Sequence, residues 1–486
     1  MTTTKVGMSG QKPSVAIQPI DPNQPRVDKT LTEQQKYEKM WTVEDYRKVS
    51  PGEMAGNTFI SVAQPEKGAE VIDFGTGTGR GAFYLWAIGG MNVTAIDFAD
   101  NCLDADVSNT AERMPDRFRF QHHDLTQPFD KMTEYGYCTD VMEHIPTEDV
   151  DTVLYNIMKS ARKVFFRIST TPDVMGPRYL KQHLHLTVQD YAWWTNKFQQ
   201  HGAIILHSED LGGAVDFYVT CWHDELPTDV LINTSTDKVL ENIKSNAAFT
   251  GKSVMPHQLQ PDMEVAMLCG GPSLNDYESE ILELHDQNIP IITMNGSYNW
   301  AQDRGINNVN QCVIDARPFN KRFVEPVRDD CNYFIASQCD PSLFEVLPPE
   351  RTHIWHVTTS PEAIEAIGNS YKDWALCGGG STVALRAIIL MRLLGFRKLT
   401  LYGFDSCVRD DSHHAYTQDE NNSKLDLVPV MVGDRTFHCQ PWMAYQAVEF
   451  GKMMKTLGNE IELTVKGDGL IAYMLETGAD APTLGE

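Results

Sequence analysis

The segment from residue 68 to residue 81 constrains the fold more than any other part of the chain. It reads GAEVIDFGTGTGRG, so a short apolar run leads directly into glycines at every second position. Glycine allows tight turns and close approach of the backbone to a ligand, and the first N–H groups of a following helix attract anions. The segment therefore predicts a buried strand, a ligand-binding loop and a helix, which is the repeating unit of an open α/β sheet.

Short β-type runs alternate with helical stretches through the rest of the first half. This alternation predicts a mainly parallel sheet wrapped by helices. Two further runs, residues 203–207 and 216–222, are close enough in sequence to form an antiparallel pair at the sheet edge, which would close the first domain near residue 225. The other strands expected here are residues 69–74, 92–98, 117–122 and 163–168.

A second α/β alternation follows a polar stretch with a helical middle at residues 238–247. We therefore expect two Rossmann-like doubly wound α/β domains, and no sequence repeat relates them. The expected divisions are a flexible N-terminal arm at 1–30, a first domain at 31–226, a linker or small helical element at 227–261 and a second domain at 262–486. The second domain is expected to hold an apolar helix at 382–394 and strands at 264–269, 290–294, 311–314, 333–336, 353–357 and 398–402.

Length and charge agree with an enzyme of two domains. The 486 residues exceed one ordinary domain, and 41 Lys and Arg against 66 Asp and Glu give a formal net charge of -25, which disfavours bulk nucleic acid as a partner. The ten cysteines form no Cys-x-x-Cys pair, so we expect small buried side chains in a reducing compartment. No apolar run approaches a membrane span and the first residues lack the core of a signal peptide, so we predict a cytoplasmic protein.

The first candidate site combines the glycine loop with acids that follow the neighbouring strands. Asp97 ends the second expected strand, where it could accept hydrogen bonds from a ribose diol, and Asp124 follows the third, where it suits an adenine amino group. Alone, Asp97 would be a strand-end or capping acid. The loop has the spacing Asp-x-Gly-x-Gly-x-Gly rather than the dinucleotide Gly-x-Gly-x-x-Gly, with its members at Asp73, Gly75, Gly77 and Gly79.

This ordered set resembles the class I S-adenosylmethionine-dependent methyltransferases over roughly residues 30–225. The resemblance implies a seven-stranded sheet and S-adenosyl-L-methionine as the methyl donor. It places the loop at the methionine end, Asp97 at the ribose and Asp124 at adenine. The segment CTDVMEHIP, residues 138–146, resembles the part after the fourth strand in the branch that acts on small molecules. That match adds Asp140 to the residues expected to bind the donor.

The sequence offers two candidates for the general base of this domain. Glu143 and His144 lie near the expected methyl position, and methyl transfer to oxygen or nitrogen needs little beyond deprotonation and in-line placement. Three aromatic residues before the loop could form a lid over the donor: Tyr37, Trp41 and Tyr46. The chain lacks the Asn/Asp-Pro-Pro-Tyr/Phe tetrapeptide and the Pro-Cys pair of DNA methyltransferases, which favours a small molecule, sugar or glycan as acceptor.

The second candidate site gathers glycines and polar residues that follow strands of the second domain. Backbone N–H groups and hydroxyls there could bind a phosphate, and the carboxyl ends of parallel strands are where such ligands bind. Asp315 and Asp405 could hold Mg²⁺, and His413 or His414 could act as a base, although a solvated loop is the competing interpretation. The candidate phosphate- or nucleotide-binding residues are Gly270, Gly271, Ser273, Asn295, Gly379, Ser381 and Thr382.

The combination resembles the domain shared by archaeal 6-hydroxymethylpterin pyrophosphokinase-like proteins and flagellin-glycosylation accessory factors, over residues 262 to about 475. It is also distantly similar to bacterial sialyltransferases. The resemblance implies a nucleotide or nucleotide-sugar ligand but leaves the activity open between glycosyl and phosphoryl transfer. We predict a bifunctional enzyme in which a methyltransferase of a small molecule, sugar or glycoconjugate is fused to such a transferase. The alternatives are a pterin-type pyrophosphokinase or an inactive nucleotide-binding module that recruits a partner, and the oligomeric state stays open.

Overall fold

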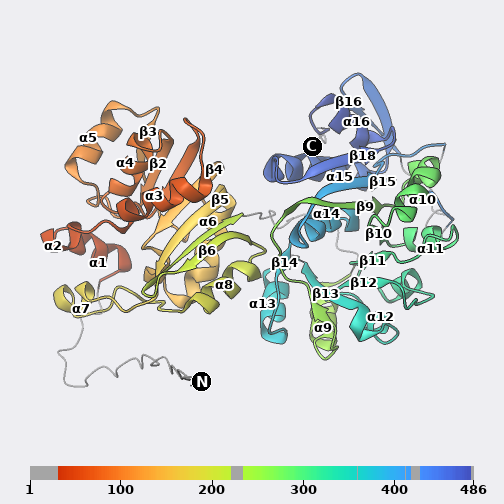
Figure 1. The fold of residues 1–486 in the computed structure, drawn as a ribbon, viewed down its shortest axis with the longest axis horizontal. Helices are drawn as coiled ribbons and strands as arrows, with labels where there is room; N and C mark the ends of the chain where they lie inside the picture. The colour runs from red at the N-terminus through yellow and green to blue at the C-terminus, as the bar shows by residue number, and fades with distance from the viewer. Residues whose placement is uncertain (1–30, 221–233, 358–359, 411, 418–426, 483–486) are drawn as a thin grey trace, which may run out of the picture.

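Two α/β units lie side by side along the longest axis of the molecule (Figure 1). The computed structural model describes residues 31–220, 234–357, 360–410, 412–417 and 427–482. The predicted arm at 1–30 lies outside these residues. Within them, no helix combines the length and apolarity needed to cross a bilayer.

The first unit contains a seven-stranded mixed sheet with the order β3-β2-β1-β4-β5-β7-β6. Only β7 runs antiparallel to its neighbours β5 and β6, and the remaining pairs are parallel. This confirms the expected seven-stranded α/β sheet with an antiparallel pair at one edge. The strands are β1 (Glu70–Phe74), β2 (Asn92–Asp97), β3 (Phe118–His122), β4 (Thr133–Thr139), β5 (Ala161–Ser169), β6 (Ile204–Asp210) and β7 (Ala214–Thr220).

Helices cover both faces of this sheet, and each face has its own apolar core. One core joins inward side chains of the strands to Phe59 of α3 and Leu85 of α4. The other joins the opposite strand face to Leu154 of α6 and Trp194 of α8, so Trp194 is a core residue. The helices are α1 (Glu33–Met40), α2 (Glu44–Arg47), α3 (Pro51–Ala63), α4 (Arg80–Ala87), α5 (Ala105–Arg113), α6 (Val150–Ser160), α7 (Met175–Tyr179) and α8 (Tyr191–Gln200).

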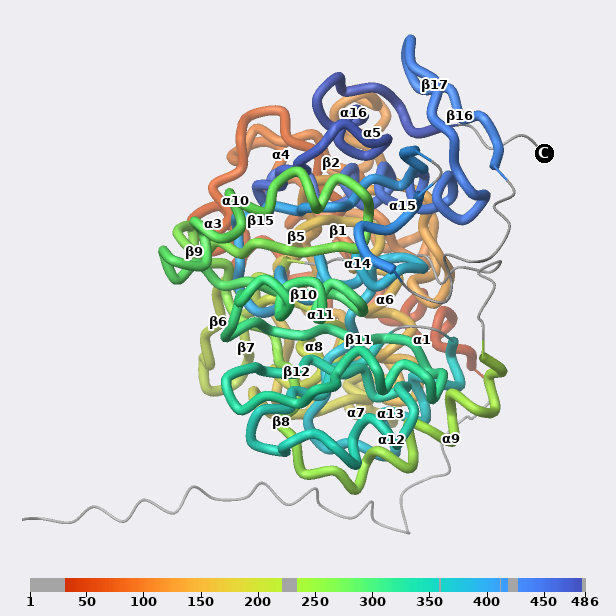
Figure 2. Tube along the Cα trace, turned by 90° about the vertical axis from the view of Figure 1, so that its right-hand side faces the viewer, coloured from red at the N-terminus to blue at the C-terminus, as the bar shows by residue number. Residues whose placement is uncertain are grey.

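The second unit is built on a nine-stranded sheet whose pairs are all parallel. Its order is β14-β13-β12-β11-β10-β9-β15-β18, with β8 pairing β13, and Figure 2 shows β15 and β9 to β12 following one another down the sheet. The strands are β8 (Lys252–Ser253), β9 (Gln260–Leu268), β10 (Ile291–Met294), β11 (Asn310–Val313), β12 (Asn332–Ala336), β13 (Thr352–Val357), β14 (Leu376–Cys377), β15 (Phe396–Tyr402) and β18 (Glu462–Lys466).

Helices and a small hairpin complete the second unit. The hairpin consists of β16 (Val428–Val432) and β17 (Arg435–Cys439), which pair antiparallel. One apolar core of the sheet includes almost every side chain of α14, as expected for its run of apolar residues. The helices are α9 (Thr236–Asn246), α10 (Glu278–Asp286), α11 (Ser297–Gln302), α12 (Pro341–Phe344), α13 (Pro361–Ser370), α14 (Val383–Leu393), α15 (Pro441–Leu457) and α16 (Leu470–Thr477).

The stretch expected to be a linker or small helical element packs onto the second unit where the structure describes it. In α9, the Asn242 amide donates to the carbonyls of Ala316 and Gln338, and the Asn246 amide donates to those of Ser337 and Cys339. These four bonds connect the helix to loops that follow β11 and β12. The short strand β8 then joins the sheet beside β13. Residues 234–261 are therefore part of the second α/β unit.

A buried polar contact joins the two units where β7 meets α14. Arg392 is fully buried, and its Nε lies 2.7 Å from Glu460 Oε2. The hydroxyl of Thr220, the last residue of β7, donates to the same Glu460 oxygen at 3.3 Å and also bonds Arg392. Gln258 adds a hydrogen bond to the carbonyl of Ile205. The interface therefore contains a charge pair shielded from water.

The cysteines follow the sequence-based expectation. The nine that the structure describes are all free and buried, and Cys221 lies outside the described residues.

Candidate active site

The glycine loop between β1 and α4 adopts the conformation that its sequence requires. Gly75, Gly77 and Gly79 have φ values of 68, 52 and 74°, in the left-handed region that favours glycine. A Cβ at Gly75 would lie 2.6 Å from Val141, and one at Gly77 would lie 3.0 Å from the ring of Trp41. Both the backbone angle and the space therefore demand glycine at these positions.

Asp97, at the end of β2, holds the loop in place. Its Oδ2 accepts a hydrogen bond from the Gly77 N–H and its Oδ1 accepts one from the Ala99 N–H, both at 2.9 Å. Burial raises the pKa of this carboxyl, and the two N–H groups oppose that rise. A carboxylate oxygen can accept more than one hydrogen bond, so Asp97 can serve the loop and a ligand together.

Asp73, at the end of β1, is a buried carboxyl beneath the loop. The Thr76 hydroxyl donates to its Oδ2 at 2.6 Å. Burial raises the pKa of Asp73 to about 7, and the charge of Asp97 adds to the rise, while the Thr76 hydrogen bond opposes it. This carboxyl would ionise readily if a cationic group entered beside it.

One pocket brings most of the predicted donor-binding residues together. It opens between the carboxyl ends of β1 and β4, where the strand order of the sheet reverses. Gly79 is not among the lining residues and serves as the N-cap of α4. Tyr37, Trp41 and Tyr46, expected in a lid, also line the pocket. The predicted donor-binding residues in its lining are Asp73, Gly75, Gly77, Asp97, Asp124 and Asp140.

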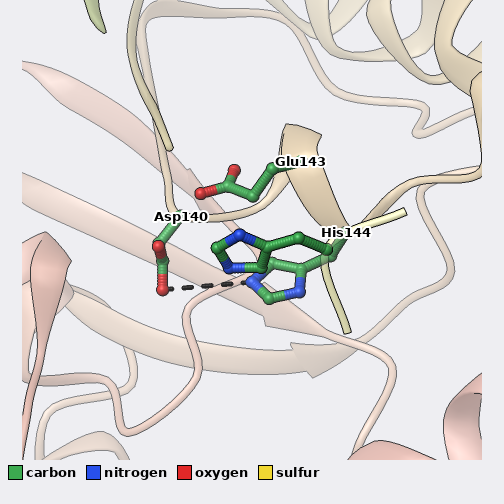
Figure 3. A group of neighbouring side chains, drawn as sticks. Asp140, Glu143 and His144 are labelled. Carbon is green, nitrogen blue, oxygen red and sulfur yellow. Dashed lines mark ion pairs between the residues drawn. The ribbon is translucent and has the colours of Figure 1, made fainter. Parts of the chain in front are cut away.

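The two predicted bases differ in their access to this pocket. His144 lines it, whereas Glu143 is fully buried and is not among the lining residues. Figure 3 shows the two side chains with Asp140. The Ser169 N–H donates to Glu143 Oε1 at 2.8 Å, and the Glu143 carbonyl accepts from the N–H groups of Leu186 and Thr187. Burial, followed by the charge of Asp140, raises the Glu143 pKa well above its usual range. Glu143 is therefore a buried residue that connects backbone segments next to the pocket.

His144 connects the segment after β4 to two distant parts of the chain. Its Nδ1 lies 2.6 Å from the Tyr37 hydroxyl and 3.1 Å from the Leu184 carbonyl oxygen. Its ring packs edge-on against His185 at a centroid distance of 4.7 Å. The sequence indicated the segment around His144 but did not single out His185 as a site residue.

The second candidate site forms around a pair of loops at the switch point between β9 and β15. The N–H and hydroxyl of Ser273 donate to the two carboxylate oxygens of Asp405 at 2.9 and 2.6 Å. A Cβ at Gly271 would lie 2.4 Å from the same carboxylate. A Cβ at Gly270 would contact both Tyr416 and His414. Here the structure brings Gly270, Gly271, Ser273, Asp405 and His414 together.

Several other residues predicted for this site form hydrogen bonds or ion pairs with other groups of the protein. Glu449 of α15 accepts hydrogen bonds from the Ser381 N–H at 3.2 Å and the Ser381 hydroxyl at 2.6 Å. The Thr382 side chain caps α14, close to Gly379 in the same glycine run, and Asp315 is paired with Arg317. Because β9 and β10 separate β11 from β15, Asp315 and Asp405 do not meet around one ion. Asn295 follows β10 with φ 52°.

Two family models match separate parts of the chain. A family model described as a methyltransferase domain matches residues 71–163, and one described as 6-hydroxymethylpterin diphosphokinase MptE-like matches residues 237–411. The chain carries a methyltransferase domain followed by an MptE-like domain. Both resemblances expected from the sequence are thereby confirmed. No curated protein matches the chain.

Solved structures similar to the chain include two methyltransferases and a glycosyltransferase. Magnesium protoporphyrin IX methyltransferase from Synechocystis PCC 6803 shares 15% identity, covering 40% of this chain and 100% of that chain, with a TM-score of 0.32. Phosphoethanolamine N-methyltransferase 2 from Haemonchus contortus shares 16%, covering 38% and 47%, also with a TM-score of 0.32. MAf glycosyltransferase from Magnetospirillum magneticum AMB-1 shares 14%, covering 90% and 65%, with a TM-score of 0.40.

Proposed function

We propose that the methyltransferase domain transfers a methyl group from S-adenosylmethionine to an oxygen or nitrogen of a small molecule, sugar or glycoconjugate. The observation that carries this proposal is that one pocket is lined by the glycine loop and by acids at the carboxyl ends of β1, β2, β3 and β4. In this arrangement Asp73 and the loop contact the methionine end, Asp97 the ribose and Asp124 the adenine. The methyl group then points toward Asp140 and His144.

The reaction requires an acceptor held in line with the donor's S–C bond. The acceptor's lone pair forms the new bond to the methyl carbon as the S–C bond breaks, its proton leaves, and neutral S-adenosylhomocysteine remains. The aromatic side chains of Tyr37, Trp41 and Tyr46 line the pocket beside this position and can exclude water from it. The pocket therefore supplies binding and alignment.

The pKa of Asp73 provides a specific test of donor binding. A bound ligand's ammonium would favour the ionised carboxylate, so binding should release a proton below pH 7. Because the free carboxyl titrates with a pKa of about 7, affinity for S-adenosylhomocysteine should rise roughly tenfold between pH 6 and pH 8. Calorimetry in buffers of different ionisation enthalpy measures both effects, and labelled S-adenosylmethionine with a panel of hydroxyl and amine acceptors then tests transfer.

Two variants make this measurement specific. Asp73→Asn should bind more weakly and lose the pH dependence, whereas Asp106→Asn, an exposed acid in α5, should behave as the unaltered chain does. Tyr137 and Cys138 lie close enough to interact with Asp73, but burial raises their own pKa values, so neither ionises over this pH range. Failure of the unaltered chain to bind S-adenosylhomocysteine at any pH would contradict the proposed function.

We further propose that the MptE-like domain binds a nucleotide or nucleotide-sugar at the β9/β15 switch point and transfers a glycosyl or phosphoryl group. The supporting observation is the convergence of Gly270, Gly271 and Ser273 with Asp405 and His414 at that edge. Pterin-type pyrophosphorylation and an inactive recruitment module are the rival functions. The same site could serve glycosyl transfer or phosphoryl transfer, so identifying the bound ligand distinguishes the two activities.

A thermal-shift panel separates these functions. Stabilisation by CMP-, UDP- or GDP-sugars but not by ATP would support glycosyl transfer, and stabilisation by ATP alone would support pyrophosphorylation. The Ser273→Ala variant should abolish the shift, because it removes the hydroxyl that donates to Asp405. Thr464→Ala, in the neighbouring strand β18, serves as the control. Absence of any shift would contradict nucleotide binding at this site.

A further inference from the structure

A cluster of four side chains, two of which line the pocket, has the composition of a metal site. Each offers one ligand atom, and these atoms all lie within 4.8 Å of one another (Figure 3). Bonds of about 2.1 Å place ligand atoms roughly 3 to 4.3 Å apart around an ion, so only small side-chain shifts are needed. The members are Asp140, Glu143, His144 and His185.

These residues come from two separate segments. Asp140 directly follows β4, and Glu143 and His144 belong to the short turn η1 (Met142–His144). His185 comes from the chain between α7 and α8, which the N–H groups of Leu186 and Thr187 fasten to the Glu143 carbonyl. The backbone thus holds the two segments together independently of any ion.

Both imidazoles are oriented as metal-binding histidines are. His185 Nδ1 lies 2.6 Å from the Thr171 carbonyl oxygen, and His144 Nδ1 lies 3.1 Å from the Leu184 carbonyl oxygen. A carbonyl only accepts, so His185 Nδ1 carries the hydrogen and its Nε2 keeps its lone pair. His144 has the same tautomer when the Tyr37 hydroxyl, 2.6 Å from its Nδ1, accepts the shared hydrogen. Donation of the other ring N–H to a backbone carbonyl is the usual support of a metal-ligating histidine.

Glu143 supplies an independent observation. Its side chain is fully buried, and among the residues that the structure describes, its Oε2 has no hydrogen-bond partner. Figure 3 shows the carboxyl group extending toward the side on which Asp140 lies. A buried acceptor without a donor is costly, and two facing carboxylates repel each other. A cation between them would satisfy the lone pair and remove the repulsion.

We propose that this cluster binds one divalent transition-metal ion. The donor set of two imidazole nitrogens and two carboxylate oxygens suits Zn²⁺, Mn²⁺ or Fe²⁺, whereas Mg²⁺ and Ca²⁺ prefer oxygen ligands alone. The sequence had indicated metal ligands only in the second domain, at Asp315 and Asp405.

The position of the ion gives it a role that rests on the proposed function. Asp140 and His144 line the donor pocket, so an ion bound to them would face the space beside the methyl group. An ion there would bind an acceptor hydroxyl and lower its pKa, which favours the oxyanion needed for attack on the methyl carbon. This reasoning selects hydroxyl over amine acceptors.

Metal binding is tested on the full chain after treatment with a chelator. Titration with Mn²⁺, followed by electron paramagnetic resonance, and with Co²⁺, followed by visible absorption, should reveal one ion per chain with nitrogen ligands. Asp140→Asn and His185→Ala should each weaken binding at least about 100-fold. Asparagine tolerates the left-handed φ of 59° at residue 140, so this change leaves the backbone unstrained.

The matched control is His183→Ala. His183 lies two residues from His185 but is exposed and paired with Asp173, outside the cluster. The His183→Ala variant should bind the ion as the unaltered chain does. Ion binding that is absent, or equal in His185→Ala and His183→Ala, would overturn the proposal.

The two proposals can fail separately. His185 is not in the lining of the donor pocket, so His185→Ala should retain S-adenosylhomocysteine binding, which also shows that the variant folds. Metal binding without S-adenosylhomocysteine binding would contradict the methyltransferase proposal and support the metal site. S-adenosylhomocysteine binding without metal binding would contradict only the proposed metal site.

Discussion

Replacement of Gly77 by arginine is expected to reduce affinity for S-adenosylhomocysteine at least about 100-fold, a loss of roughly 2.8 kcal/mol. Gly77 has a φ of 52°, and a Cβ there would lie 3.0 Å from the Trp41 ring. A long side chain starting at this point fills the pocket between loop and ring, and the strained backbone weakens the N–H bond to Asp97. Isothermal titration calorimetry measures the loss directly.

Gly68→Arg is the matched control for this prediction. Gly68 has a φ of 85°, also in the left-handed region, but nothing lies within 4 Å of a Cβ built there. Both variants therefore carry a backbone cost of about 1–2 kcal/mol, whereas only Gly77 borders the pocket. Gly68→Arg should bind the ligand normally despite its lower stability. Equal affinities in the two variants would show that the pocket is not the donor site.

Much of the fold followed from the sequence because its strands are short apolar runs next to glycine turns. β1 and β2 are examples, since almost every side chain in them is buried. β18, ELTVK, escaped prediction because its side chains are only partly buried or exposed at the edge of the sheet. β14 has only two residues, too few to produce a pattern. β4 was inferred only through the motif that follows it, and Gly136 interrupts its β-type pattern.

The candidate site was predictable where its residues are neighbours in sequence. The glycine loop and the acids after the strands follow from local patterns. The contact between Tyr37 and His144 spans 107 residues, and that between His144 and the Leu184 carbonyl spans 40. Only the folded chain brings such groups together, so the cluster with His185 was not predicted. The bond between Ser381 and Glu449, 68 residues apart, was missed for the same reason.

The interface between the units shows how a long-range contact also controls stability. Arg392 is fully buried, and within the described part of the chain its Nη1 has no hydrogen-bond partner. Its charge is therefore balanced chiefly by Glu460, with the Thr220 hydroxyl as a further contact. A buried charge that loses its partner costs far more than an exposed one, because water cannot replace the missing interaction.

Glu460→Ala is accordingly expected to lower the free energy of unfolding by about 3–5 kcal/mol. The control is Glu462→Ala, two residues away, whose exposed pair with Arg397 is worth less than about 1 kcal/mol. Urea denaturation of the full chain, followed by circular dichroism, compares the two. Adding Arg392→Met to Glu460→Ala should recover most of the loss, since the unpaired charge is gone. Equal destabilisation by Glu460→Ala and Glu462→Ala would contradict a buried charge pair at this interface.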